Sequence, residues 1–350
     1  MGKQKLLTNS SMTCAKTCLR MYWLKYVKGL YKQREDTPLF VGSMFHVGME
    51  NGKVPDFQDP PSYITEEDET YKYNCMQALA RGMVKAYLEY WADDTTEIVE
   101  TEQEFYQPIF NPETNGITPN FKVAGKIDKI VKLPKRKNAL ALMEHKTTSD
   151  DITPGSAYWR KLLMDQQISL YFMAAQSAGY DVKYILYDVT RRPDLKPKML
   201  AVLDKDGKKI VNDENGNRVY NKDGKKPRQT GGEGLTMVKE PETVAAYEKR
   251  VYTDMMERPE YYFCRQDIPR LASDFTEFQY ELWQQQKMLQ ECHKNGYFFK
   301  NTGACFKWNK PCEYFDICTE GGLDESSEFA PIGFEFKKPH VELNGKGGKK

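Results

Sequence analysis

Charged side chains interrupt apolar segments in the middle of this chain, and this feature constrains its fold more than any other. Asp128 lies inside the apolar run GKIDKIV, and Glu144 and Lys146 end the run ALALMEHK. The second run is apolar on both faces up to Glu144, which is typical of a strand buried in the centre of a sheet. Because side chains alternate along a strand, Glu144 and Lys146 should face one side of the sheet and His145 the other.

Strand and helix patterns around these residues predict one α/β core. Apolar or alternating runs indicate strands at residues 96–110, 120–133, 139–147 and 182–190. Apolar residues at helical spacing indicate helices at residues 8–34, 39–50, 63–91 and 158–178. Helices packed on the faces of such a sheet form a sandwich around one hydrophobic core.

The overall charge excludes some classes of protein. The 350 residues carry a formal net charge of +1, which argues against a histone-like or tail-driven nucleic-acid binder but leaves room for a local basic groove. Residues 8–34 interleave aromatic residues with Lys and Arg, a pattern that fits either a nucleic-acid backbone or a solvated polar face. No apolar run approaches the roughly 18 residues that span a bilayer, so we expect a cytoplasmic protein without a membrane segment.

The length of 350 residues fits one large domain or two. We expect a single domain over residues 1–320, followed by a polar, disordered tail at 321–350. Its expected parts are an N-terminal helical segment at 8–93, a catalytic core at 96–190, a hairpin insertion at 200–235, and C-terminal helices with a cysteine cluster at 240–320. Asp-Gly and Asn-Gly pairs recur within residues 205–234. Such pairs are typical of tight β-turns, so we expect an exposed, mobile insertion of short hairpins without a functional site.

Two carboxylates and a lysine at the ends of adjacent strands suit metal-assisted cleavage of a phosphodiester. A hard divalent cation stabilises charge on the phosphorus and is held by oxygen ligands such as Asp128 and Glu144. Without a cation, two buried carboxylates would repel one another. Lys146 could hold or deprotonate the attacking water, and His46 could complete the coordination. The competing interpretation is structural, with Asp128 in a turn or ion pair and Glu144 simply paired with Lys146.

Three of the eight cysteines lie close together near the C-terminus: Cys305, Cys312 and Cys318. In a long intracellular chain, clustered cysteines are more often metal ligands or reduced thiols than disulfides. Three thiolates make an incomplete four-ligand site for zinc or an iron–sulfur cluster, and a fourth ligand must come from elsewhere. The alternative is three unrelated buried thiols.

The ordered set GSMFH, GKID, EHKTT and QQISLY resembles the RecB-like nucleases of the PD-(D/E)XK superfamily. It is most similar to the iron–sulfur branch, which includes phage-type and CRISPR-associated RecB-like exonucleases and the AddB nuclease domain. The resemblance implies a restriction-endonuclease-like core, with a central mixed sheet flanked by helices. The ligands it implies for Mg²⁺ or Mn²⁺ are His46, Asp128, Glu144 and the carbonyl of His145.

The same resemblance implies further roles. Lys146 would be the catalytic lysine, while Gln167 and Tyr171, one helical turn apart, would line the site and contact DNA or orient the metal shell. One N-terminal and three C-terminal cysteines would hold a [4Fe–4S] cluster that joins the two ends of the domain. These cysteines would be Cys18, Cys305, Cys312 and Cys318.

The cysteine spacing departs from the family in one respect. Six residues separate Cys305 from Cys312, where the family often has two, so Cys292 and Cys14 are alternative ligands. Zinc is the alternative occupant.

These observations predict a metal-dependent DNA exonuclease that acts in recombination, repair or phage DNA metabolism, on linear ends or single-stranded DNA. The sequence contains no GxxxxGK[ST] motif, so a separate helicase or a recombinase or annealing protein is an expected partner. Two other functions stay open. One is a site-specific or structure-specific DNA endonuclease of the same fold, and the other is a non-catalytic DNA-binding protein that contains a metal cluster.

Overall fold

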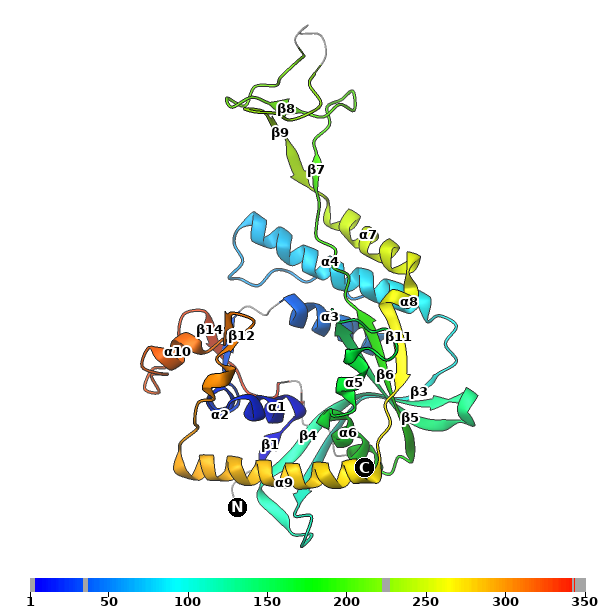
Figure 1. Ribbon diagram of the computed structural model, residues 1–350, viewed down its shortest axis with the longest axis vertical. Coiled ribbons are helices and arrows are strands. Elements are labelled where there is room, and N and C mark those ends of the chain that lie inside the picture. Colours follow the sequence, from blue (N-terminus) through cyan, green and yellow to red (C-terminus); the bar gives the residue numbers. More distant parts are fainter. Residues whose placement is uncertain (1–3, 34–36, 222–226, 342, 344–350) are drawn as a thin grey trace. The chain divides into compact units, whose positions relative to one another are not determined.

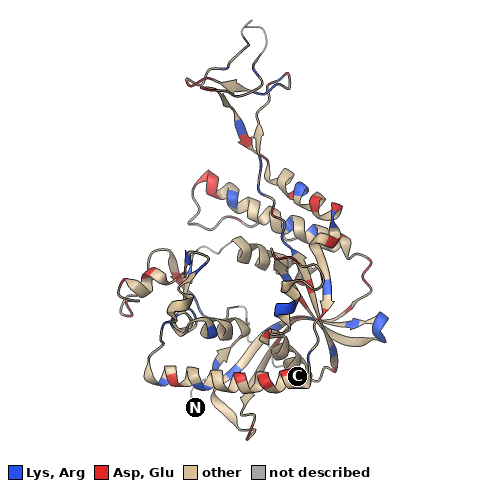
Figure 2. Ribbon diagram, in the orientation of Figure 1, with Lys and Arg blue, Asp and Glu red and all other residues tan. Residues whose placement is uncertain are grey.

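The computed structural model describes residues 4–33, 37–221, 227–341 and 343, and they form two compact units (Figure 1). The first unit comprises Met1–Leu39, Asp93–Thr190 and Phe263–Lys350, and the second comprises Phe40–Ala92 and Arg191–Tyr262. Acidic and basic residues are interspersed along both units (Figure 2). None of the helices in the described ranges is long and apolar enough to cross a membrane.

A six-stranded mixed sheet forms the centre of the first unit. Its strands are β1 (Lys5–Leu7), β3 (Glu97–Phe110), β4 (Ile117–Leu133), β5 (Ala139–Thr148), β6 (Val182–Arg191) and β11 (Phe263–Asp267). The long strand β4 runs antiparallel to β3 and β5 and parallel to β1, while β11 runs antiparallel to β6. The predicted α/β class and the four predicted strands are therefore confirmed, with boundaries that differ by at most a few residues.

Helices of the first unit pack against this sheet: α1 (Asn9–Thr17), α2 (Leu19–Tyr22), α5 (Ala157–Leu162), α6 (Gln166–Ser177) and α9 (Ala272–Asn295). A further helix, α10 (Phe315–Thr319), packs in a separate apolar cluster with Leu24, Leu30 and Tyr314. The main hydrophobic cluster joins the helices to one side of β5 through Leu142, while Met143 belongs to a smaller cluster that contains Val131 and Leu186. The side chains of β5 therefore alternate between two apolar environments, as predicted.

Two predicted helices are interrupted. The predicted helix at 158–178 is divided into α5 and α6, because Asp165 begins a new helix by accepting a hydrogen bond from the Gln167 amide at 2.8 Å. The predicted helix at 8–34 breaks at Cys18, whose extended backbone separates α1 from α2. After a π-helical turn at Trp23–Val27, Gly29 adopts a φ of +72° and leads into β2 (Leu30–Lys32).

The prediction of a disordered tail from residue 321 is wrong for one segment. Strand β14 (Phe334–Phe336) pairs antiparallel with β2. Phe334 also stacks on Tyr314, with ring centroids 5.6 Å apart. An alternating Phe-Glu-Phe sequence suits such a pairing, because it presents aromatic rings on one face. Residues 342 and 344–350 of the predicted tail lie outside the described residues.

The second unit contains a helical part and a β-hairpin arm. Its elements are α3 (Thr37–Asn51), which starts just before the unit's first residue, α4 (Glu67–Tyr90), α7 (Val244–Glu257), α8 (Pro259–Tyr262), β7 (Met199–Ala201), β8 (Val211–Asn212), β9 (Thr236–Met237) and β10 (Lys239–Pro241). The helices α4 and α7 pack closely, and the Arg81 guanidinium donates to Glu248 at 2.8 Å.

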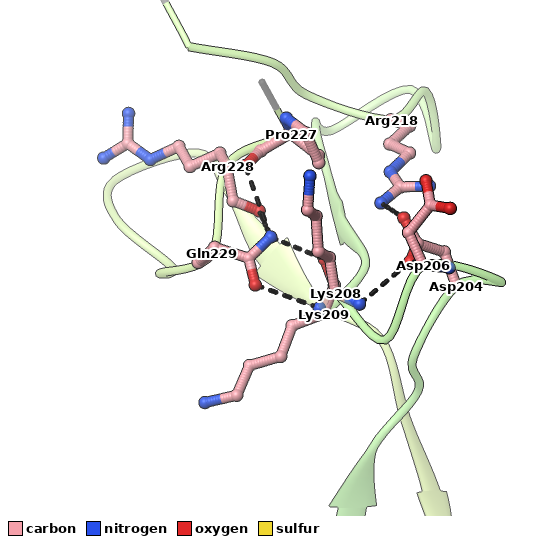
Figure 3. Close-up of polar contacts among 8 residues, drawn as sticks. All are labelled: Asp204, Asp206, Lys208, Lys209, Arg218, Pro227, Arg228 and Gln229. Carbon is pink, nitrogen blue, oxygen red and sulfur yellow. Dashed lines mark hydrogen bonds and ion pairs between the residues drawn. The ribbon is translucent and has the colours of Figure 1, made fainter.

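The arm consists of short hairpins, in agreement with its Asp-Gly and Asn-Gly pairs. Strands β7 and β10 pair at its base, and β8 pairs with β9 further out. In the first turn, Asp204 accepts hydrogen bonds from the amides of Asp206 and Lys208 at 2.9 and 2.8 Å, while Gly207 has a φ of +74° (Figure 3). The Arg218 side chain from the next hairpin donates to the same carboxylate at 2.5 Å. The third predicted turn, at residues 222–226, lies outside the described residues.

We expect Gly82→Ala to destabilise the second unit. A Cβ at this position would lie 2.9 Å from Val251 Cγ1 and 3.0 Å from the Glu248 carbonyl oxygen on α7. The helix-propensity gain of about 1 kcal/mol is smaller than the cost of overpacking, which reaches about 3 kcal/mol. Thermal unfolding should show a lower midpoint. The control is Gly231→Ala, whose Cβ would have ordinary contacts, and equal midpoints for both variants would contradict the expectation.

Candidate active site

Neighbouring strands bring Asp128 and Glu144 together in the first unit. The antiparallel register of β4 and β5 pairs Lys129 with Met143. The main-chain amide of His145 donates a hydrogen bond to Asp128 Oδ2 at 2.8 Å. Lys146 Nζ donates to Glu144 Oε1 at 2.6 Å, and Glu144 is only 5% exposed. The acid, acid and lysine that the sequence singled out thus come from two adjacent strands of one sheet.

The amide side chain of Gln167 connects the two charged groups on β5. Its Nε2 donates to Glu144 Oε1 at 2.8 Å, while its Oε1 accepts from Lys146 Nζ at 3.1 Å. Gln167 lies in the first turn of α6, which Asp165 caps. The start of α6 therefore sets the position of the Glu144–Lys146 pair.

The glycine of GKID is required by the packing of Tyr171. A Cβ at Gly125 would lie 2.7 Å from the ring of Phe105 and 3.2 Å from that of Tyr171. These two rings pack edge to face, with centroids 5.6 Å apart. Only a residue without a side chain leaves room for them, so the GxxD and QxxxY motifs are in direct contact. Burial, together with Glu144 and Asp128, raises the pKa of Tyr171 well above its usual value.

Burial and neighbouring charges shift the pKa values of Asp128 and Lys146. Burial raises the pKa of Asp128 from 3.8 to about 6, against the opposing effects of Lys146 and the His145 amide. Burial disfavours the charged form of Lys146, but Glu144 and Asp128 outweigh it and raise the pKa of the ammonium. Lys146 is therefore protonated at neutral pH in this arrangement, while Asp128 is a carboxylate that a nearby cation would stabilise.

The imidazole of His145 points to the other side of the sheet. It is 1% exposed, and its Nδ1 lies 3.5 Å from Asp188 Oδ2 on β6. Arg265 on β11 donates to the same oxygen at 2.7 Å and to Asp94 at 2.5 Å. A network of charged groups thus extends from His145 on β5 through Asp188 on β6 to Arg265 on β11. The imidazole of His145 belongs to this network, while its main-chain amide contacts Asp128.

Three further residues belong to the site's surroundings and escaped sequence reasoning. Burial is the largest influence on Tyr158, whose pKa rises to about 12, and on Tyr187, whose pKa is raised further. Within the described residues, the buried hydroxyl of Tyr187 has no hydrogen-bond partner. The negative charges of Glu144 and Asp165 also raise the pKa of both tyrosines. Of the three residues, only Asp165 could have been found from the sequence, because an acidic residue immediately before the QQISLY run is typical of a helix N-cap.

His46 lies on α3 in the second unit, where the neighbouring Phe45 packs edge to face on Tyr87 at 5.7 Å. The role of His46 as a metal ligand stays a prediction.

The four cysteines expected to act together line one cavity of the first unit. Cys18, Cys305, Cys312 and Cys318 surround it together with Met21, Tyr314 and Phe315, among others. The longer spacing between Cys305 and Cys312 forms a hairpin of β12 (Phe306–Lys307) and β13 (Lys310–Pro311). The Cys312 amide donates to the Cys305 carbonyl at 2.7 Å, so the extra residues loop out and leave the two cysteines opposite each other.

The alternative cysteines do not line this cavity. Cys14 is buried on α1, and burial raises its pKa to about 12, while Cys292 packs in the main hydrophobic cluster. The geometry thus favours the set that contains Cys305.

The protein offers two sets of possible metal ligands, one of carboxylates and one of thiols. Within the part of the chain that the structure describes, no three His, Cys, Asp or Glu side chains form a metal-binding group. On β4 and β5 the side-chain donors are the two carboxylates of Asp128 and Glu144. Two carboxylates, a main-chain carbonyl and several waters are a donor set that suits Mg²⁺ or Mn²⁺. The four thiols around one cavity have the chemistry, although not the grouped arrangement, of a soft-metal site.

We expect Asp128→Asn to stabilise the metal-free protein at pH 8. A carboxyl group whose pKa is raised on folding stabilises the fold below about pH 4 and loses that contribution as pH rises through about 6. Asparagine cannot ionise, so the gain at pH 8 should reach up to about 3 kcal/mol, since one pKa unit corresponds to about 1.4 kcal/mol. Denaturant unfolding at pH 4 and pH 8 measures it.

The same experiment reports on the cation. Mg²⁺ or Mn²⁺ should raise the unfolding midpoint of the wild-type protein but not that of Asp128→Asn. The exposed Asp181, which pairs with Lys183, provides the control variant Asp181→Asn, and this variant should behave like the wild type. A loss of stability in metal-free Asp128→Asn at pH 8 would contradict the expectation.

One family model matches most of this chain. Residues 7–319 match the model of a family described as "PD-(D/E)XK nuclease superfamily". A solved structure titled "Crystal structure of SSO0001" is 12% identical and covers 73% of this chain and 78% of that chain, with a TM-score of 0.28. No curated protein matches the sequence. Because the family match extends over most of the chain, the protein belongs to the PD-(D/E)XK nuclease superfamily.

Proposed function

We propose that this protein is a metal-dependent DNA exonuclease of the RecB-like branch, which uses Mg²⁺ or Mn²⁺. The observation that carries the proposal is the cluster in which Lys146 Nζ contacts both Glu144 and Gln167 beside the half-buried Asp128. A structural ion pair alone would have no need of a second carboxylate whose surroundings make its ionisation unfavourable. The contact of Gln167 with both charged groups supports the RecB-like branch, in which this glutamine is expected.

The proposed roles follow from the positions of the side chains. Asp128 and Glu144 would hold the cation through their carboxylate oxygens, with the His145 carbonyl, and with His46 as a further predicted ligand. The bound cation would supply charge stabilisation at the phosphate and an acidified water. Gln167 fixes the distance between Glu144 and Lys146. Tyr171 closes the site over Gly125 and would contact the DNA.

The raised pKa of Lys146 supports one of its two suggested roles. An ammonium that is kept protonated by Glu144 and Asp128 can donate hydrogen bonds to the attacking water and to a phosphate oxygen, but it cannot remove a proton. We therefore assign Lys146 to positioning the water and offsetting the charge that develops on the phosphate.

The partners are proposed on the same basis. The substrate is DNA with linear ends or single strands, and the protein would act in the cytoplasm during recombination, repair or phage DNA metabolism. A separate helicase or annealing protein would provide the opened strand.

Replacement of Lys146 tests the active site. We expect Lys146→Ala to lower the rate of DNA cleavage by about 10²–10³-fold, the loss typical of one charge-stabilising donor, while the variant stays folded. The control is Lys183→Ala, which removes an exposed lysine of β6. Full activity of Lys146→Ala would refute the site.

The form of the DNA substrate distinguishes an exonuclease from an endonuclease. Linear and closed-circular DNA are each incubated with the wild-type protein and Mg²⁺. Degradation of linear DNA alone supports the exonuclease, whereas cutting of circular DNA supports the endonuclease.

We further propose that Cys18, Cys305, Cys312 and Cys318 hold a [4Fe–4S] cluster, with zinc as the alternative. Their common cavity supports the proposal. The cluster would tie the start of the chain to its C-terminal segment, and closing so long a loop restricts the unfolded chain strongly. Its role would thus be structural.

Anaerobic purification tests the cluster. We expect a brown protein with iron and sulfide in equal amounts, and Cys305→Ser should lose iron and unfold at a lower temperature. Cys264→Ser, which changes a cysteine on β11 away from the cavity, is the control and should keep its iron. A colourless protein with zinc would support the alternative occupant. A metal-free protein that is as stable as the metal-loaded one would refute both.

A further inference from the structure

The hairpin between Cys305 and Cys312 ends in an unusual turn. Strands β12 and β13 pair Phe306 with Pro311 and Lys307 with Lys310, which leaves only Trp308 and Asn309 in the turn. Two-residue turns of this kind favour sequences such as Asn-Gly. Nothing in the pairing of the strands calls for a tryptophan at this position.

Trp308 is held in a backbone conformation that bulky residues avoid. Its φ is +53°, and that of Asn309 is +58°, so both residues lie in the left-handed region. Asparagine adopts this region readily, but a large aromatic residue there is an outlier that costs free energy. Glycine in the same place would carry no such cost.

Burial does not compensate for this strain. The Trp308 side chain is 88% exposed. The hairpin is anchored instead by Phe306, whose ring packs edge to face on Phe315 of α10 with centroids 4.9 Å apart. The indole at the tip therefore contributes little to holding the hairpin on the protein.

The lysines that flank the turn add a second unfavourable feature. Lys307 and Lys310 are exposed and lie directly opposite each other in the register, and like charges in opposite positions repel. Neither lysine forms an ion pair with another residue in the described ranges. An anion bound between them would turn this repulsion into attraction.

We propose that the tip of this hairpin binds single-stranded DNA, with an unpaired base stacked on Trp308 and its phosphates on Lys307 and Lys310. Aromatic side chains beside a row of cations are how proteins bind single strands without reading their sequence, because every base has a face that can stack. An apolar protein partner would fit less well, since lysines and an asparagine surround the indole. The inference rests on the proposed nuclease function and names a strand contact outside the catalytic cluster.

Trp308→Gly separates a structural role from a binding role. Glycine relieves the backbone strain, so the thermal midpoint and the metal content should stay the same or rise. The affinity for an end-labelled oligodeoxythymidylate, measured in chelator to prevent cleavage, should fall about tenfold. Trp308→Phe should recover part of the affinity, because phenylalanine can still stack. In the wild type, the strand should quench tryptophan fluorescence, and Trp308→Gly should lose most of that quenching.

Two controls complete the test. Phe329 is 84% exposed on the same unit but has no neighbouring lysines in the sequence, so Phe329→Ala should bind like the wild type. Replacing Lys307 and Lys310 together by Gln should weaken binding and lower the dependence of log Kd on log salt by about 1.4, since each contact with a single strand contributes about 0.7. If Trp308→Gly binds the strand as tightly as the wild type, the inference is wrong, even when DNA cleavage confirms the nuclease. If the wild type neither binds nor cleaves DNA, the proposed function fails with it.

Discussion

The ion pair between Lys146 and Glu144 is the interaction on which the arrangement of the first unit depends. It places two charges at the edge of a hydrophobic core, where an unpaired charge would be very costly. Gln167 contacts both partners, and it can do so only because Asp165 begins a new helix two residues earlier. The break between α5 and α6 is therefore part of the site, since a continuous helix would have no free amides at Gln167 to be capped.

The reverse face of the sheet supports the same residues. The peptide unit between Glu144 and His145 donates to Asp128, while the His145 ring is tied to Asp188 and, through it, to Arg265. A shift of β5 along β4 would break contacts on both faces at once. Strand alternation thus lets one three-residue segment hold the Glu144–Lys146 pair on one side and a buried polar network on the other.

The sequence was sufficient for those parts of the site that depend on local periodicity. Alternation along 139–147 predicted that Lys146 shares a face with Glu144, while the place of Gln167 at the site was implied only by the family resemblance. It was insufficient where strand order decides the outcome. The partnership of His145 with Asp188 requires β6 beside β5, and β11 beside β6, which no local pattern encodes. Similarly, the six residues between Cys305 and Cys312 departed from the family's spacing, and the Trp-Asn turn that accommodates them is a poor sequence signal for a two-residue hairpin.

Two residues in the first unit lie in environments that cost folding free energy. Asp128 is half-buried in surroundings that raise its pKa to about 6, and Trp308 is exposed in a strained turn between two like charges. Gly125, by contrast, removes a conflict, since its missing side chain makes room for Phe105 and Tyr171. A feature that costs folding free energy is best explained by something that binds there. For Asp128 that would be a cation, and for Trp308 and its lysines a base with its phosphates. Under the proposed function both would belong to one substrate, because a strand cleaved at the carboxylates would also have to be held elsewhere on the protein.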